Sequence, residues 1–66
     1  MNAFKKMRLL SGKTAKQAAE EGNLKYTSIL RWEGGVSRPK ADVLPTLAKL
    51  YGCEIKEFIG EYETAR

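Results

Sequence analysis

The sequence contains no histidine and a single cysteine, Cys53, among its 66 residues. A lone cysteine excludes a disulfide within the chain, and without histidine a zinc site has few ligands. Because Cys53 has no histidine or CxxC partner, we interpret it as a small buried apolar residue in a reducing compartment, not as a reactive thiol. Packing alone must therefore stabilise the chain, which at this length favours a compact helical domain or a dimer.

Long apolar runs are also absent. No stretch approaches the roughly 20 apolar residues of a membrane span, and the amino terminus lacks the apolar core of a signal peptide. We therefore expect a soluble, cytoplasmic protein. The sequence has no nucleophile with a recognisable base, no phosphate-binding glycine loop and no metal-ligand cluster. We expect no enzymatic activity, and no cofactor, metal or small-molecule ligand.

Charge is unevenly distributed along the chain. The net charge of +4 and the pI near 9.4 favour acidic partners, nucleic acid above all. Acidic residues crowd the carboxyl end, so we expect one basic and one acidic side of the molecule. These acidic residues are Glu54, Glu57, Glu61 and Glu63. The first 40 residues carry most of the bases: Lys5, Lys6, Arg8, Lys13, Lys16, Lys25, Arg31, Arg38 and Lys40.

Residues 3–11 are predicted to form a first helix, with Asn2 as its N-cap and Gly12 at its end. An arginine lies on its apolar side, and it needs an acidic partner because burying an unpaired guanidinium is very costly. That side comprises Phe4, Met7 and Arg8, extended by Leu9 or Leu10.

A helix-turn-helix is predicted next. Thr14 and Gln17 have the spacing of a capping box, which places a second helix at about residues 14–21. Its inward positions are small and would let another helix approach closely: Ala15, Ala18 and Ala19. Gly22-Asn23 can adopt left-handed conformations and would form the tight turn before a third helix at about residues 25–33.

The third helix has two faces. Leu24, Ile29 and Trp32 can share one apolar side, and Gly34-Gly35 ends the helix. The other side carries a phenol, a hydroxyl and a guanidinium, which we interpret as a surface that reads DNA. Its members are Tyr26, Thr27 and Arg31, together with Leu30.

Two further helices complete an all-α chain. Asp42 is the expected N-cap of the fourth, with Pro45 in the first turn and Gly52 after the end; a start at Lys40 or Ala41 would make Pro45 remove or strain an early bond. The fourth helix carries inward Leu44, Leu47, Ala48, and Leu50 or Tyr51. A fifth, at about residues 54–60, offers Ile55, Phe58 and Ile59 to the core. Residues 61–66 are expected to be a polar, frayed tail.

Taken together, these patterns resemble the Cro/C1-type (lambda-repressor-like, XRE-like) helix-turn-helix family from Phe4 to Phe58. The motifs are Phe4-x-x-Met7-Arg8-x-x-x-Gly12, Thr14-x-x-x-Ala18-Ala19, Leu24-x-x-x-x-Ile29-x-Arg31-Trp32-Glu33-Gly34-Gly35, and Pro39 followed by Leu44-x-x-Leu47-Ala48-x-x-Tyr51-Gly52-Cys53-x-Ile55-x-Glu57-Phe58. The resemblance implies one compact five-helix domain over residues 1–66, with the third helix in the DNA major groove. It also implies a structural salt bridge between Arg8 and Glu33.

The resemblance further implies which residues contact DNA. Arg31 would bind guanine O6 and N7, Thr27 a base edge or a thymine methyl, and Tyr26 a sugar or phosphate. Leu30 stands where a small or polar residue is usual, and it is either a thymine-methyl contact or simply an exposed leucine. The phosphate contacts would come from Thr14, Lys16, Lys25, Ser28, the Gly35 amide, Ser37, Arg38 and Lys40.

Four positions depart from the family's pattern. Lys25 replaces the usual Ser or Thr N-cap of the third helix, at a cost of about 1 kcal/mol of helix stability, while adding a phosphate-seeking charge. Gly34 replaces a frequent asparagine, which removes a donor near the DNA backbone. Ala15 replaces a glutamine that often touches phosphate, and Lys13 stands where an apolar residue is common. Weak binding by a monomer would follow if nothing compensates.

The leading functional hypothesis is a sequence-specific transcriptional regulator, a small phage- or mobile-element-type repressor that binds an inverted-repeat operator as a homodimer. Candidates for its dimer surface are Ile55, Phe58, Ile59 and Tyr62, of which the first three also suit the core. Alternatives are an antitoxin-like regulator, or an interaction module that keeps the fold but binds protein. A winged-helix excisionase-like domain is more distant, because the fourth-helix pattern argues against a wing of strands after Gly35.

Overall fold

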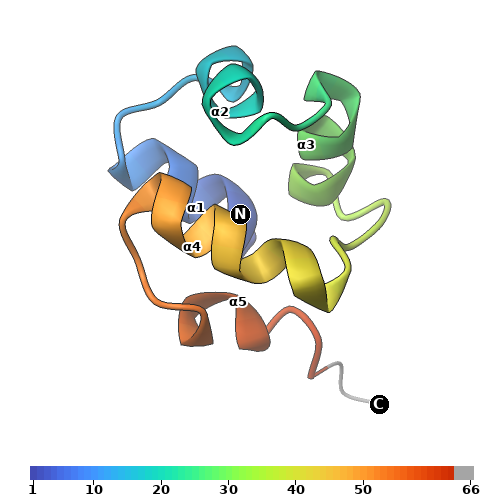
Figure 1. The fold of residues 1–66 in the computed structure, drawn as a ribbon. Helices are drawn as coiled ribbons and strands as arrows, with labels where there is room; N and C mark the ends of the chain where they lie inside the picture. The colour runs from blue at the N-terminus through green and yellow to red at the C-terminus, as the bar shows by residue number, and fades with distance from the viewer. Residues whose placement is uncertain (64–66) are drawn as a thin grey trace.

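Five α-helices and one 3-10 turn make up the part of the chain that the computed structural model describes, residues 1–63 (Figure 1). Their bounds are α1 Ala3–Leu10, α2 Ala15–Gly22, α3 Tyr26–Glu33, the 3-10 turn η1 Ala41–Val43, α4 Leu44–Tyr51 and α5 Lys56–Ile59. Residues 1–63 contain five α-helices and no strand, so the prediction of an all-α chain with five helices is confirmed. None of these helices combines the length and apolar character needed to cross a membrane.

Helices α1 and α4 lie at the centre of the molecule, with α2 and α3 on one side and α5 on the other (Figure 1). The core between them includes two stacked aromatic rings. Phe4 of α1 lies nearly parallel to Phe58 of α5, with ring centroids 5.3 Å apart. Ala18 of α2 is fully buried, and its small side chain lets α2 approach its neighbours closely. The buried core residues are Phe4, Met7, Ala18, Ala19, Ile29, Leu44, Leu47, Ala48, Tyr51 and Phe58.

Local capping rules explain where the first two helices begin. The Asn2 side chain accepts a hydrogen bond from the Lys5 amide at 3.1 Å. Thr14 and Gln17 form the complete capping box, in which the side chain of each residue accepts from the backbone amide of the other. Both predicted starts are therefore confirmed, since these side chains satisfy amides that have no partner inside the helix.

Each of the helices α1 to α4 is followed within two residues by a residue in the left-handed conformation: Gly12, Asn23, Gly35 and Gly52. After α3, the Gly35 amide donates to the Trp32 carbonyl at 3.2 Å and the Val36 amide to the Arg31 carbonyl at 3.0 Å. This is the Schellman pattern, which satisfies carbonyls left free by the helix end.

The turn between α2 and α3 differs in one detail from the prediction. Asn23 alone is left-handed, with φ 54°, whereas Gly22 is the last residue of α2. A Cβ atom at Gly22 would lie 3.0 Å from Leu50 Cδ2 and 3.1 Å from Leu24 Cδ1. Glycine at this position therefore permits the close approach of α2 to α4, and asparagine makes the turn.

The start of α4 also differs from the prediction. Asp42 is not an N-cap, because it lies inside η1, which continues directly into α4. The Val43 amide donates a hydrogen bond to the Lys40 carbonyl at 2.8 Å. This 3-10 turn, and not a capping side chain, therefore begins the helical segment. Pro45 lies in the first turn of α4, as expected, where its missing N–H costs little.

Several apolar residues predicted for the core are on the surface. Leu9 and Leu10 are exposed, because only the Phe4, Met7 and Arg8 side of α1 faces the other helices. Ile55, just before α5, and Ile59, its last residue, are each 40% exposed, whereas Phe58 is buried against Phe4 of α1. At the end of α4, Tyr51 is the buried residue and Leu50 is only partly buried.

Two residues of the segment expected to fray, Glu61 and Tyr62, make contacts with the rest of the fold. The Glu61 carboxylate accepts a hydrogen bond from the Ala3 amide at 2.8 Å. The Tyr62 ring meets Phe4 edge-on, with centroids 6.4 Å apart. The remainder of that predicted tail, residues 64–66, lies outside the described part of the chain.

Candidate nucleic-acid interface

Helix α3 is anchored on one side and exposed on the other. Ile29 is buried, and Leu24 and Trp32 pack against the core as partly buried neighbours. On the opposite side, Tyr26 and Leu30 are 49% and 44% exposed. Thr27 and Arg31 are exposed with them, so the structure brings together the four side chains to which the sequence assigned base contacts. An exposed surface of this kind on a well-packed helix is suited to entering a groove.

The far end of α3 is held by an ion pair with α1. Arg8 Nε lies 2.6 Å from Glu33 Oε2, and Arg8 Nη2 donates to Glu33 Oε1 at 2.9 Å. Arg8 Nη1 donates to the Lys13 carbonyl at 2.9 Å. The hydrogen bond with Glu33 raises the pKa of Arg8, an effect that burial partly opposes. The single arginine thereby joins the α1–α2 loop to the end of α3, in the pairing that the family resemblance implied.

Two more contacts strengthen this junction. The Asn2 side-chain amide donates to the Trp32 carbonyl at 2.8 Å, so the residue that caps α1 also binds the last turn of α3. Lys13, where an apolar residue was expected, places its ammonium 2.9 Å from a carboxylate oxygen of Glu21. The polar residue is accommodated because its side chain pairs at the surface while its carbonyl receives Arg8.

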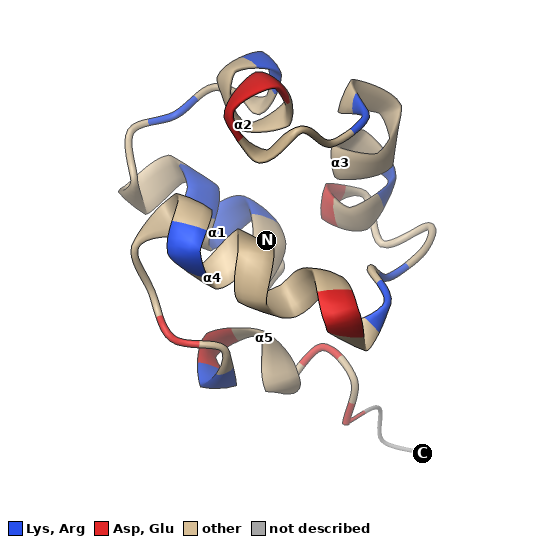
Figure 2. Cartoon of the chain, in the orientation of Figure 1, with Lys and Arg blue, Asp and Glu red and all other residues tan. Residues whose placement is uncertain are grey.

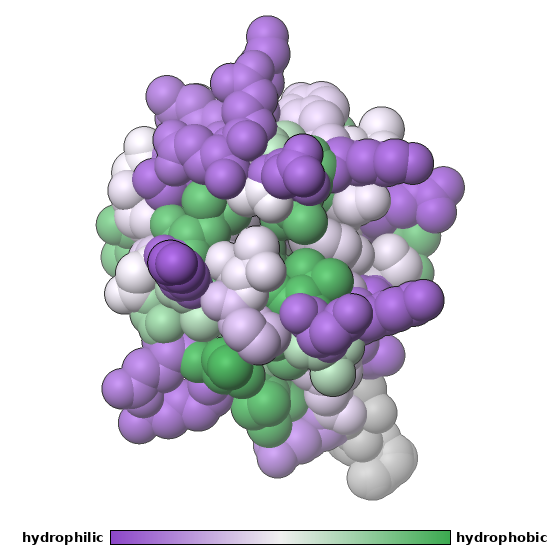
Figure 3. Space-filling view, in the orientation of Figure 1, coloured by the Kyte–Doolittle hydropathy of each residue, from purple (hydrophilic) through white to green (hydrophobic). Residues whose placement is uncertain are grey.

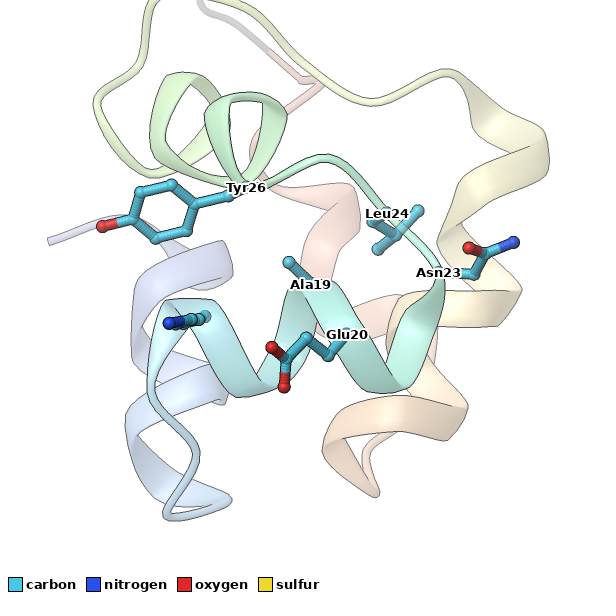
Figure 4. A pocket seen from close by; sticks show the side chains of 6 residues that line it. Ala19, Glu20, Asn23, Leu24 and Tyr26 are labelled. Atoms are coloured by element: carbon cyan, nitrogen blue, oxygen red, sulfur yellow. The ribbon is translucent and has the colours of Figure 1, made fainter.

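An open cleft of about 620 Å³ separates α2 from the start of α3. Figure 4 shows Tyr26 projecting from α3 and Glu20 from α2, with Ala19 and Leu24 at the base of the cleft. The lining residues are Lys16, Ala19, Glu20, Asn23, Leu24 and Tyr26. Glu20 is not among the residues expected at the DNA interface, although its position one helical turn after Lys16 places both on one side of α2. This carboxylate would repel phosphate beside the expected DNA contacts.

Basic residues lie on all five helices and on the loop after α3, whereas half of the acidic residues lie on α5 and the turns beside it and the others on α2, α3 and η1 (Figure 2). The separation is incomplete, because α2 also carries Glu20 and Glu21. Among the residues assigned to phosphate, Ser28 and Ser37 are half-buried. The exposed ones are Thr14, Lys16, Lys25, Gly35, Arg38 and Lys40.

Two of these residues already have hydrogen-bond partners within the fold. The Gly35 amide is already used, since it donates to the Trp32 carbonyl in the turn that ends α3, and so it is not a free donor for phosphate. Arg38 is partly engaged as well. Its Nε donates to the Glu61 carbonyl at 2.6 Å, and its guanidinium carbon lies 5.9 Å from the centre of the Tyr62 ring. Neither partner was foreseen from the sequence, because both lie in the segment expected to fray.

Lys25 stands at the N-cap of α3 without a side-chain hydrogen bond to the helix. As expected from the replacement of the family's usual Ser or Thr by Lys25, helix α3 lacks a side-chain N-cap. The first turn of α3 keeps amides that the chain's own N-cap side chain does not satisfy, and a basic side chain stands beside them. Such a helix start favours an anion.

Comparison with known proteins gives one match. The family model described as helix-turn-helix matches residues 4–58, most of the chain. A search of curated proteins and a search of solved structures each found no match. The matched range begins at Phe4 and ends at Phe58, the two residues whose rings stack in the core.

Proposed function

The chain belongs to the Cro/C1-type helix-turn-helix family of DNA-binding regulators, and we propose that it acts as a small repressor of the phage or mobile-element type. In this proposal the whole chain, residues 1–66, is one domain that recognises duplex DNA. The observation that carries it is the exposed side of α3, opposite a buried side that fixes the helix to the core.

Base recognition is assigned to the exposed residues of α3. Arg31 donates two hydrogen bonds to guanine O6 and N7 in the major groove, and Thr27 contacts a base edge or a thymine methyl. Leu30 offers an apolar surface to a thymine methyl, which its 44% exposure supports. Tyr26, at the edge of the cleft, contacts a sugar or phosphate.

The residues proposed to contact phosphate lie around this surface, and their contacts fix the register of the protein on the duplex. Because its amide is used within the fold, Gly35 is left out of this set. The proposed contacts are Thr14, Lys16, Lys25, Ser28, Ser37, Arg38 and Lys40.

A homodimer is the second part of the proposal. Ile55, the N-cap residue of α5, and Ile59, its last residue, are four residues apart and each 40% exposed, and this spacing lets them share one exposed apolar surface. Figure 3 shows a hydrophobic area on the lower part of the molecule, where Figure 1 places α5. Pairing of two such surfaces about a two-fold axis would present two α3 helices to one face of the DNA.

Selection of bound duplexes from a random pool tests the proposal. We expect an enriched inverted repeat with half-site centres about 10 base pairs apart, one turn of DNA. Arg31→Ala should weaken binding to that site by about 1–3 kcal/mol. Lys49→Ala is the matched control, because this exposed base lies on α4, outside both the proposed DNA interface and the proposed dimer surface, and its loss should leave affinity nearly unchanged.

Three outcomes would contradict parts of the proposal. If the protein binds no duplex even at low salt, DNA recognition is wrong and a protein-binding module is favoured. An enriched site without two-fold symmetry contradicts the dimer alone. The Ile59→Ser variant examines the dimer directly: it should lower self-association in sedimentation experiments while leaving the helical content unchanged.

A further inference from the structure

The turn after α5 contacts the loop that follows α3. The Tyr62 hydroxyl donates to the Pro39 carbonyl at 2.5 Å, and Arg38 Nε donates to the Glu61 carbonyl at 2.6 Å. The Arg38 guanidinium also lies over the Tyr62 ring, with its central carbon 5.9 Å from the ring centre. Glu61 and Tyr62 thus hold Arg38, the first basic residue after α3, although they lie far from it in the sequence.

This turn is itself fixed to the core. The Tyr62 ring packs edge-on against Phe4, and its amide donates to the Ile59 carbonyl at 2.9 Å. The Glu61 carboxylate accepts from the Ala3 amide at the start of α1. We name Glu61 and Tyr62 the carboxyl clasp, because they connect α1 and α5 with the loop at residues 36–40.

The positive charge of Arg38 is not paired with the Glu61 carboxylate, so Arg38 can still bind an anion. The Glu61 carboxylate points to Ala3 and not to the guanidinium, so Arg38 meets the carbonyl of Glu61 and forms no ion pair within residues 1–63. The Nη nitrogens of Arg38 donate no hydrogen bond within that same range. One edge of the guanidinium is thereby held by the protein while the other keeps its donors and its positive charge.

We propose that Glu61 and Tyr62 are positioning residues that set Arg38 and the loop at residues 36–40 in place for the DNA backbone. This inference rests on the proposed DNA-binding function and adds two residues that do not touch DNA. An arginine whose side chain is already fixed loses less rotamer freedom when it meets a phosphate, so the complex is stabilised. The bond to Pro39 fixes the backbone of a loop that belongs to no helix.

Tyr62→Phe tests the clasp, because it removes the hydroxyl and keeps the ring that packs on Phe4. The probe is a mixed-sequence duplex of about 20 base pairs, since phosphate contacts do not depend on sequence. We expect binding about 3- to 10-fold weaker than wild type, and a salt dependence of binding shifted toward that of Arg38→Ala, whose slope should fall by about 0.9 for the lost phosphate contact. Tyr51→Phe is the matched control, a tyrosine hydroxyl lost from α4, and should bind like wild type.

A double-mutant cycle separates positioning from general destabilisation. In an Arg38→Ala background, adding Tyr62→Phe should change affinity less than about twofold, because the hydroxyl fixes the backbone at Pro39, next to Arg38, and the Arg38 side chain is already gone. Urea unfolding of each variant confirms that all are folded under the binding conditions. Wild-type affinity in Tyr62→Phe overturns the clasp, as do losses that add fully with Arg38→Ala. If the wild type itself binds no duplex, the proposed function fails first, and the positioning role fails with it.

Discussion

Arg8 and Glu33 meet in a two-point ion pair between α1 and the end of α3, and their side chains are only 11% and 7% exposed. Replacing Glu33 with leucine would leave a nearly buried guanidinium without its partner. We expect Glu33→Leu to lower the free energy of unfolding by about 3–5 kcal/mol, as measured by urea denaturation. The double variant Arg8→Met/Glu33→Leu should recover much of that loss. A double variant as unstable as the single one would show that the charge itself is not what destabilises the fold.

Ionisation of the buried Tyr51 side chain should lower the free energy of unfolding at alkaline pH. Burial, aided by the nearby Glu33 carboxylate, raises the pKa of Tyr51 from its ordinary value of 10.0 to about 12. The folded state therefore favours the neutral phenol, so this contribution is complete below pH 10 and is lost as the pH rises toward 12. Urea denaturation at increasing pH should show the decline, and Tyr51→Phe should reduce it. Some decline should remain, since burial also raises the pKa of Cys53 and Tyr62. An identical decline in wild type and Tyr51→Phe would contradict this assignment.

Asn23 should be sensitive to substitution because of its backbone, with φ 54° and ψ 44°. A β-carbon is disfavoured in the left-handed region, and asparagine tolerates it better than alanine does. Asn23→Ala should therefore cost about 1 kcal/mol of stability, whereas Asn23→Gly should keep or slightly raise it. Thermal unfolding of both variants provides the measurement. Equal stability for Ala and Gly would argue against strain at this turn.

Lys25 should lower the stability of the fold while adding a positive charge for DNA binding. A serine at this uncapped position can accept a hydrogen bond from the first turn of α3, so Lys25→Ser should raise the free energy of unfolding by about 1 kcal/mol. The same change should lower the salt dependence of DNA binding by about 0.9 in slope, through one lost phosphate contact. Lys25→Ala separates the effects, because it removes the charge without adding a cap. An unchanged slope in both variants would remove Lys25 from the interface.

Local signals account for what the sequence predicted well. The caps at Asn2 and Thr14 depend on side chains and amides only three residues apart, and their geometry is set within one turn. The buried positions of α1 and α4 follow a helical period over about two turns. The exposed side of α3 was foreseen for the same reason, since Ile29 and Trp32 define its inner side.

Longer-range contacts account for what it did not predict. One helical turn is too short for periodicity to define an inner side, which is why Ile55 and Ile59 were placed in the core together with Phe58. The partners of Glu61 and Tyr62 are Ala3 and Pro39, which no local pattern connects with the polar end of the chain. The use of the Gly35 amide likewise depends on the conformation of the turn after α3.

The stacking of Phe4 on Phe58 has a consequence for local opening of the molecule. It joins the first and last helices, so forming it closes a loop that contains most of the chain, at a larger entropy cost than the neighbouring α2–α3 contact. We expect the amides of α5 to exchange with solvent faster than those of α4, as partial unfolding would detach α5 first. Tyr62 would leave with it, and the loop at residues 36–40 would lose its support while α3 stayed in place.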